Sequence, residues 1–156
     1  MMAGVAQFPV PPVVKEAVIS LPLEAAFTRF TREIGLWWPT ASHTVSGVET
    51  ESVMMEERQG GRLFERAKDG REHLWGTITR WEPPSALAFT WHVGRAPNLA
   101  QLVELRFRAL DESSTTVTLV HSGWEKLGAD AEPVRSDYEG GWELVFMKSF
   151  TNLKGR

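Results

Sequence analysis

The feature that most constrains the fold is a series of strand-like segments between residues 48 and 124. Six segments rich in β-branched, aromatic and alternating apolar residues follow one another, and turn-forming residues separate them. They span residues 49–57, 62–68, 71–81, 86–93, 101–110 and 115–124. The pattern predicts six consecutive antiparallel strands.

Turn sequences between these segments support the prediction. Asp69-Gly70 is the strongest hairpin signal in the chain, because a type I′ turn requires two residues that tolerate positive φ. Pro83-Pro84 and Gly60-Gly61 interrupt the apolar pattern at two further places. The glycines lack the GxxxxGK or GxGxxG context of a phosphate-binding loop, so turns are predicted there.

Helical patterns are expected on either side of these segments. A strand over residues 13–20 comes first, and Pro22 then suits the first position of a helix. Apolar residues recur at helical spacing after it, at Leu23, Ala26, Phe27, Phe30 and Ile34. A short second helix is predicted to end at Trp37-Trp38, because Pro39 disfavours helix in the residue before it.

Residues 131–153 predict a long C-terminal helix. One stripe runs along it, formed by Tyr138, Trp142, Val145, Phe146, Ser149 and Leu153. Gly140-Gly141 lies inside this helix and weakens it by about 1 kcal/mol per glycine relative to alanine. The pair indicates either a bend or a place where the helix backbone meets something closely.

Length and composition limit the classes of protein that fit. The 156 residues suit one domain, predicted over residues 13–153, after a flexible arm over residues 1–12 in which prolines oppose regular structure. A net charge of −3 and the lack of any basic cluster argue against partners such as nucleic acid or an anionic membrane. No cysteine is present, which removes disulfides and thiolate chemistry. The N-terminus resembles neither a signal peptide nor a membrane span, so a cytoplasmic location is expected.

Much of the aromatic content falls on the predicted strands. Seven tryptophans and eight phenylalanines are more bulky flat surface than a close-packed core normally uses. Alternation predicts an inward set formed by Phe89, Trp91, Val103, Leu105, Phe107, Val117, Leu119 and His121. Trp75 and Trp81 share a parity that Ile78 does not, so a β-bulge is predicted between the two tryptophans. Large rings leave gaps when they pack together, so the aromatic content favours an apolar cleft that could hold a small molecule.

The order of elements, together with several motifs, resembles the helix-grip fold of the START and birch-pollen-allergen superfamily, also called SRPBCC. The motifs are PLEAAFTRFT…WWP (22–39), RQGGRLFE (58–65), GTITRWEPPSALAFTW (76–91), TTVTLVHSGW (115–124) and GGWELVFMKSFTNL (140–153). They are most similar to the stand-alone branch named for the activator of heat-shock protein 90 ATPase. The resemblance implies an α+β protein in which a curved seven-stranded antiparallel sheet wraps around the long C-terminal helix and leaves a cavity. It also implies two short helices after the first strand, and no shared catalytic set.

Residues on the inward faces are the candidates for a ligand-binding wall. They are Trp75, Phe89, Trp91, Phe107, His121, Trp142 and Phe146. His121 ends an apolar strand face, so it is either a core histidine with satisfied hydrogen bonds or a polar anchor that orients a ligand and titrates near neutrality. The four histidines lack the spacing of a metal motif, and no cofactor is expected. Glu51 on the first of the six strands could pair with His121 as acid and base.

Three functions remain open at this point. The leading hypothesis is a cofactor-free protein that binds a small hydrophobic or aromatic molecule in the cavity. The second, which follows from the family name, is a module that interacts with a chaperone. The third is a cavity enzyme resembling the cyclases and hydrolases of related folds, which needs at least two polar groups in the cavity. Only His121, with Glu51 as its partner, can be proposed for that role, and a shared fold does not by itself establish a reaction. The N-terminal arm also leaves room for a homodimer formed by exchange of that arm.

Overall fold

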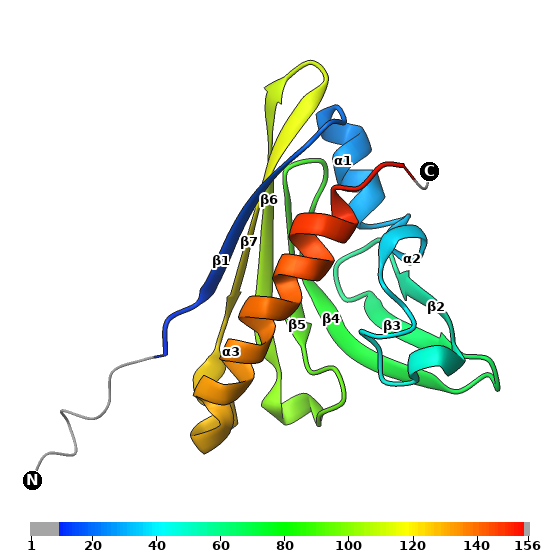
Figure 1. Cartoon of the computed structure of the whole chain (residues 1–156), viewed down its shortest axis with the longest axis vertical. Coiled ribbons are helices and arrows are strands. Elements are labelled where there is room, and N and C mark those ends of the chain that lie inside the picture. The colour runs from blue at the N-terminus through cyan, green and yellow to red at the C-terminus, as the bar shows by residue number, and fades with distance from the viewer. Residues whose placement is uncertain (1–9, 155–156) are drawn as a thin grey trace, which may run out of the picture.

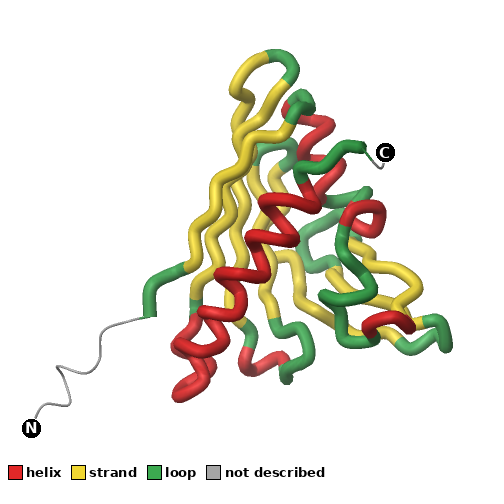
Figure 2. Tube along the Cα trace, in the orientation of Figure 1, coloured by secondary structure: helices red, strands yellow, loops and turns green. Residues whose placement is uncertain are grey.

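The computed structural model describes residues 10–154. Residues 1–9, which make up most of the predicted arm, and residues 155–156 lie outside the described residues. The protein has an α+β helix-grip fold, in which an antiparallel sheet curls around the C-terminal helix (Figures 1 and 2). The sheet has seven strands in the order β1-β7-β6-β5-β4-β3-β2. The predicted fold class is confirmed.

The elements follow the predicted order along the chain. The strands are β1 (Val13–Ile19), β2 (Thr50–Met55), β3 (Arg62–Ala67), β4 (Glu72–Glu82), β5 (Ala86–Trp91), β6 (Gln101–Asp111) and β7 (Ser114–Ser122). Helices α1 (Leu23–Phe30) and α2 (Ile34–Trp37) follow β1, and 3₁₀ segments occupy η2 (Gly47–Glu49), η3 (Pro97–Leu99) and η4 (Trp124–Asp130). The C-terminal helix consists of α3 (Ala131–Trp142) and a π-helical continuation, η5 (Glu143–Phe150).

Alternation on the central strands builds the core. Three cross-strand pairs join the inward residues of β6 and β7, namely Phe107 with Val117, Leu105 with Leu119 and Val103 with His121. All six are buried, and so are Phe89 and Trp91 of β5. The predicted inward set is confirmed. On β1 the odd-numbered residues face the core. Val13 and Ile19 are buried, whereas Val14 and Val18 are more than half exposed.

Strand β4 contains two irregularities, and both lie in its tryptophan-rich stretch. Its pairing with β3 shifts by one residue at Trp75, and its pairing with β5 shifts again between Ile78 and Arg80. Each shift changes the parity of the residues that follow, as a β-bulge does. Trp75 and Ile78 are therefore both buried, and Trp81 packs its ring 5.2 Å from that of Phe27. The predicted bulge between Trp75 and Trp81 is confirmed.

The β3–β4 hairpin forms where Asp69-Gly70 predicts it, but the predicted turn type is wrong. Gly70 has a φ of 90°, whereas no non-glycine residue among residues 10–154 has a positive φ. The amide of Gly70 donates to the backbone oxygen of Ala67 at 2.9 Å, and the amide of Ala67 donates to that of Arg71 at 2.8 Å. A type I turn followed by a left-handed glycine accounts for this pattern. Asp69 keeps an ordinary backbone conformation.

Helix α1 holds the end of the C-terminal helix through a buried arginine. The side chain of Arg29 donates hydrogen bonds to the backbone oxygens of Phe150 at 2.7 Å, Asn152 at 2.9 Å and Ser149 at 3.3 Å. The last carbonyls of a helix lack intrahelical donors, so the guanidinium satisfies them. The stripe predicts a helix that continues to residue 153, but the helix ends at Phe150.

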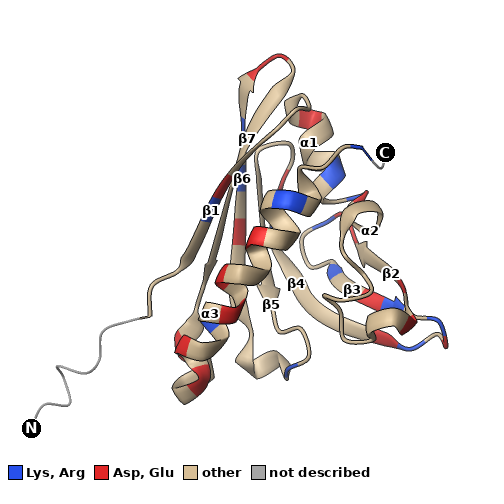
Figure 3. Cartoon of the chain, in the orientation of Figure 1, with Lys and Arg blue, Asp and Glu red and all other residues tan. Residues whose placement is uncertain are grey.

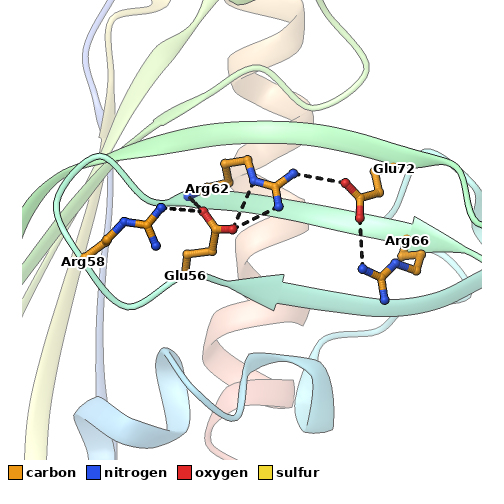
Figure 4. A network of polar contacts seen from close by, with 5 residues as sticks. All are labelled: Glu56, Arg58, Arg62, Arg66 and Glu72. Carbon is orange, nitrogen blue, oxygen red and sulfur yellow. Dashed lines mark hydrogen bonds and ion pairs between the residues drawn. The ribbon is translucent and has the colours of Figure 1, made fainter.

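Charged side chains lie mostly on the outer surface. Figure 3 shows acidic positions recurring along the C-terminal helix, and two of them, Glu139 and Glu143, form ion pairs with Lys15 of β1. A second network, shown in Figure 4, connects the β2–β3 turn, β3 and β4 through Arg58, Glu56, Arg62, Glu72 and Arg66. Exposed pairs of this kind contribute little to stability, because water screens them.

Candidate ligand-binding site

A pocket of about 250 Å³ lies between the α2–β2 loop, the end of β5 and one face of the C-terminal helix. It is lined by Trp38, Ser42, His43, Thr44, Trp91, Val93, Asp137, Tyr138, Gly141, Trp142 and Val145. Behind it the rings pack directly on one another, with centroids 5.0 Å apart for Trp38 and Trp75 and 5.5 Å apart for Trp75 and Trp91. The aromatic surface is thus divided between a filled core and a pocket wall.

Three tryptophans form the apolar wall of the pocket. Their ring centroids are 5.4 to 6.0 Å apart, and every indole N–H is hydrogen-bonded within the protein. Trp38 donates to the backbone oxygen of His43 at 2.8 Å, Trp91 to the hydroxyl of Tyr138 at 2.9 Å and Trp142 to Nδ1 of His121 at 3.0 Å. The wall therefore presents ring surface in fixed orientations, which lowers the ordering cost of binding.

Polar groups are few and lie at defined places in the pocket. The hydroxyl of Tyr138 accepts the bond from Trp91, and among the described residues it donates to none. Burial raises the pKa of Tyr138, so the hydroxyl stays protonated and can donate to a ligand. On the loop side, Oγ of Ser42 lies 2.7 Å from Nδ1 of His43. Asp137 and Ser42 are exposed and make the mouth of the pocket polar.

A buried carboxylate that the sequence analysis did not select fixes the loop side of the pocket. Glu65 of β3 is 0% exposed and accepts hydrogen bonds from the amides of Val45 and Ser46 and from the indole of Trp75, all at 2.7 Å. Burial by itself raises the pKa of Glu65, but these hydrogen bonds outweigh it and the net pKa is lowered. The ionised carboxylate thus joins the α2–β2 loop to the sheet.

The structure brings two of the seven predicted wall residues to the pocket, namely Trp91 and Trp142. The other five are absent from the pocket lining and are buried in the core: Trp75, Phe89, Phe107, His121 and Phe146. Conversely, Trp38, His43, Tyr138 and Gly141 line the pocket and were not predicted as wall residues. Tyr138 lies on the predicted stripe of the C-terminal helix, together with Trp142. Trp38 and His43 follow α2 and Gly141 has no side chain, so neither strand alternation nor helical spacing marks these three.

Of the two alternatives for His121, the structure supports the core histidine with satisfied hydrogen bonds and not the anchor that titrates near neutrality. Burial lowers its pKa to about 3. Nδ1 accepts the bond from Trp142, and Nε2 lies 3.2 Å from Oε1 of Gln101, so both ring nitrogens have partners. Glu51 is exposed on β2 and so does not reach the buried ring as an acid–base partner.

Within residues 10–154, no three histidine, aspartate or glutamate side chains are grouped so that they could hold a metal ion. The helices of that range include none with the length and apolar character needed to cross a membrane.

The curled sheet, the helix that it grips and the pocket beside them define a helix-grip protein of the START and birch-pollen-allergen superfamily. A model of the family described as Activator of Hsp90 ATPase homolog 1-like protein matches residues 20–154. The chain belongs to this family, as its motifs predicted. No curated protein matches it.

Solved structures agree with this assignment. The chain is 30% identical to an anthrahydroquino-γ-pyrone synthase, Txn09, complexed with SUM, over 84% of this chain and 88% of that one, with a TM-score of 0.59. It is 21% identical to BH1534 of Bacillus halodurans, over 92% and 96%, with a TM-score of 0.65. It is 23% identical to CalC of Micromonospora echinospora, a self-sacrificing resistance protein, over 90% and 92%, with a TM-score of 0.63. The last two support the fold alone.

Proposed function

We propose that this protein binds a flat aromatic small molecule in the pocket beside the C-terminal helix. The observation that carries the proposal is the wall of three indoles around a space of about 250 Å³. Flat ligands stack on indole faces, and burial of apolar surface contributes roughly 25 cal/mol per Å² before ordering costs. The fixed orientation of the rings keeps those costs low.

The size of the pocket limits the ligand. Its volume is just below the ~300–1,000 Å³ of pockets that enclose drug-sized molecules. The mouth is open at the exposed residues Ser42 and Asp137. We therefore expect a ligand of a few fused rings, with its apolar body against the tryptophans and a polar edge at the mouth.

The hydroxyl of Tyr138 indicates which chemical group the ligand carries on the edge that enters the pocket. As a protonated donor that already accepts a bond from Trp91, it has its hydrogen left for a ligand acceptor. A carbonyl oxygen on an aromatic ring system fits that role. The name of the 30% identical synthase refers to a compound of this chemistry, which supports a fused-ring carbonyl compound as the ligand class.

Tryptophan fluorescence tests this function directly. Anthraquinone should quench the emission in a saturable manner. Trp142→Phe should weaken anthraquinone binding at least threefold, because it replaces the indole that the C-terminal helix contributes to the wall by a smaller ring. Trp81→Phe is the matched control, since Trp81 lies outside the pocket. Equal losses in the two variants, or no saturable signal with the unmodified protein, would count against the proposal.

A second candidate is an enzyme that transforms the bound molecule. The contact of 2.7 Å between Ser42 and His43 favours it, because it places a pair able to transfer protons in the wall of the pocket. The named activity of Txn09 points in the same direction. Mass spectrometry separates the two functions: an enzyme changes the mass or retention of its ligand, and His43→Gln abolishes that change while ligand affinity is kept.

A further inference from the structure

A glycine occupies the centre of the helix face that lines the pocket. The pocket-lining residues of the C-terminal helix are Asp137, Tyr138, Gly141, Trp142 and Val145. Asp137 and Val145 lie four residues before and four residues after Gly141, and residues four apart share a helix face. A side chain at position 141 would therefore point into the pocket, between the directions of Asp137 and Val145.

Neither backbone geometry nor packing within the protein requires a glycine at this position. Gly141 is not among the glycines with positive φ, and a Cβ built there would meet no atom within 4 Å beyond its chain neighbours and the backbone of its own helix. Gly76 shows the opposite case, because a Cβ there would lie 1.7 Å from the backbone oxygen of Thr90. Helix interiors also disfavour glycine relative to alanine. The folded protein alone would accept a larger residue at position 141.

We propose that Gly141 sets the size of the molecule that the pocket admits. The bare helix backbone at this position leaves open the space that a side chain would fill, and the ligand lies against it. This inference rests on the proposed binding function and adds the residue that determines its specificity. A side chain at position 141 would shorten the space available beside the tryptophans, so larger ring systems are excluded before smaller ones.

Gly140 provides a matched control one position away. It is exposed, it does not line the pocket, and a Cβ there would also meet no atom within 4 Å. One residue along a helix turns the side chain by about 100°, so position 140 faces solvent while position 141 faces the pocket. Substitutions at the two positions change helix propensity equally and differ only in what the new side chain meets.

The experiment measures the dissociation constants of two probes by tryptophan fluorescence. Menadione has two fused rings and anthraquinone has three. The variants are Gly141→Ala, Gly141→Leu, Gly140→Ala and Gly140→Leu. We expect both alanine variants to raise the melting temperature by a similar amount. Gly141→Leu should weaken anthraquinone binding at least tenfold and menadione binding less, and Gly141→Ala should show the same order with smaller changes. Both Gly140 variants should bind as the unmodified protein does.

Three results would overturn the inference. If the Gly141 variants keep the affinity of the unmodified protein for both probes, the position does not determine size. If the Gly140 and Gly141 variants lose affinity equally, the glycine pair acts on the helix as a whole. If the unmodified protein binds neither probe, the proposed function itself fails, and the inference fails with it. Gly141→Ala keeps the test valid if the leucine variant does not fold.

Discussion

The indole of Trp142 donates a hydrogen bond to Nδ1 of His121, with 3.0 Å between the nitrogens. Nδ1 must then be the unprotonated nitrogen, and the proton on Nε2 is directed to the side-chain oxygen of Gln101. His121 is fully buried behind the pocket wall. It is therefore a positioning residue, which holds the ring plane of a tryptophan that lines the pocket.

This arrangement predicts a specific dependence of stability on pH. Burial lowers the pKa of His121 from 6.5 to about 3, so the unfolded chain binds a proton in that window and the folded protein does not. The contribution is fully present above pH 6.5 and is lost as the pH falls, by up to about 1.4 kcal/mol per pH unit. Between pH 6.5 and 5 most carboxylates remain ionised, so this interval separates histidines from carboxylates. A variant of His121 then distinguishes it from the other three histidines.

Urea denaturation at pH 6.5 and pH 5 checks the prediction. The free energy of unfolding should fall over this interval, and His121→Gln, which can still accept from Trp142, should show a smaller fall. The NMR signals of the His121 ring should not shift over the same interval. A ring that titrates near pH 6.5 in the folded protein would contradict the assignment.

The strands and the core could be predicted from the sequence because strand alternation directly reports which residues face inward. Val103, Leu105 and Phe107 illustrate this, since all three are buried as predicted. The same rule applies to Glu65, which shares its strand face with the buried residues Leu63 and Ala67, so alternation alone indicates that this carboxylate faces inward.

The pocket could not be predicted in the same way. Trp38 lies at the end of α2, and its ring reaches the pocket only because the α2–β2 loop folds back beside the C-terminal helix. Its partner in the wall, Trp142, was selected from the helix stripe. The π-helical continuation changes the spacing after Trp142, and Phe150, which is not on the predicted stripe, is buried there. No local pattern of 3.6 residues per turn reports such a change.

Glu65→Gln should destabilise the fold by about 2–4 kcal/mol. The amide side chain can offer an oxygen to two of the three donors but presents an N–H to the third, and each hydrogen bond to a charged group contributes about 1.5–3 kcal/mol. Because the pKa of Glu65 is lowered, its contribution is present above pH 4.5 and is lost as the pH falls through the lower folded value.

Chemical denaturation at neutral pH measures this change, and hydrogen exchange of the amides of Val45 and Ser46 locates it. Glu104→Gln is the control, since Glu104 is exposed on β6 and should leave stability unchanged. An unaltered exchange rate at the two amides in Glu65→Gln would show that the carboxylate does not hold the loop.

Tyr138→Phe should reduce the affinity for anthraquinone about five- to tenfold, because a net hydrogen bond contributes about 1 kcal/mol. Anthracene has the same ring frame without carbonyl oxygens, so its affinity should change little. Tyr138→Phe also removes the acceptor of the Trp91 indole, which could disturb the pocket wall for any ligand. The comparison of the two ligands separates this effect from the loss of a hydrogen bond to the ligand. Equal losses for both ligands would mean that Tyr138 shapes the wall without bonding to the ligand.

Arg29→Lys should destabilise the protein by about 2–4 kcal/mol, although the charge is kept. The planar guanidinium donates to three backbone oxygens at the end of the C-terminal helix. The single ammonium of a lysine cannot place its N–H donors in the same arrangement. The exposed pair of Arg32 with Glu57 offers the control, because Arg32→Lys should leave the denaturation midpoint unchanged. The loss in Arg29→Lys should appear as faster hydrogen exchange in the last turn, around Phe150, while the strands remain protected. If exchange there is unchanged and the midpoint falls only slightly, the helix end is held by the packing of Phe150 against Phe30 and Trp37, and the arginine is dispensable.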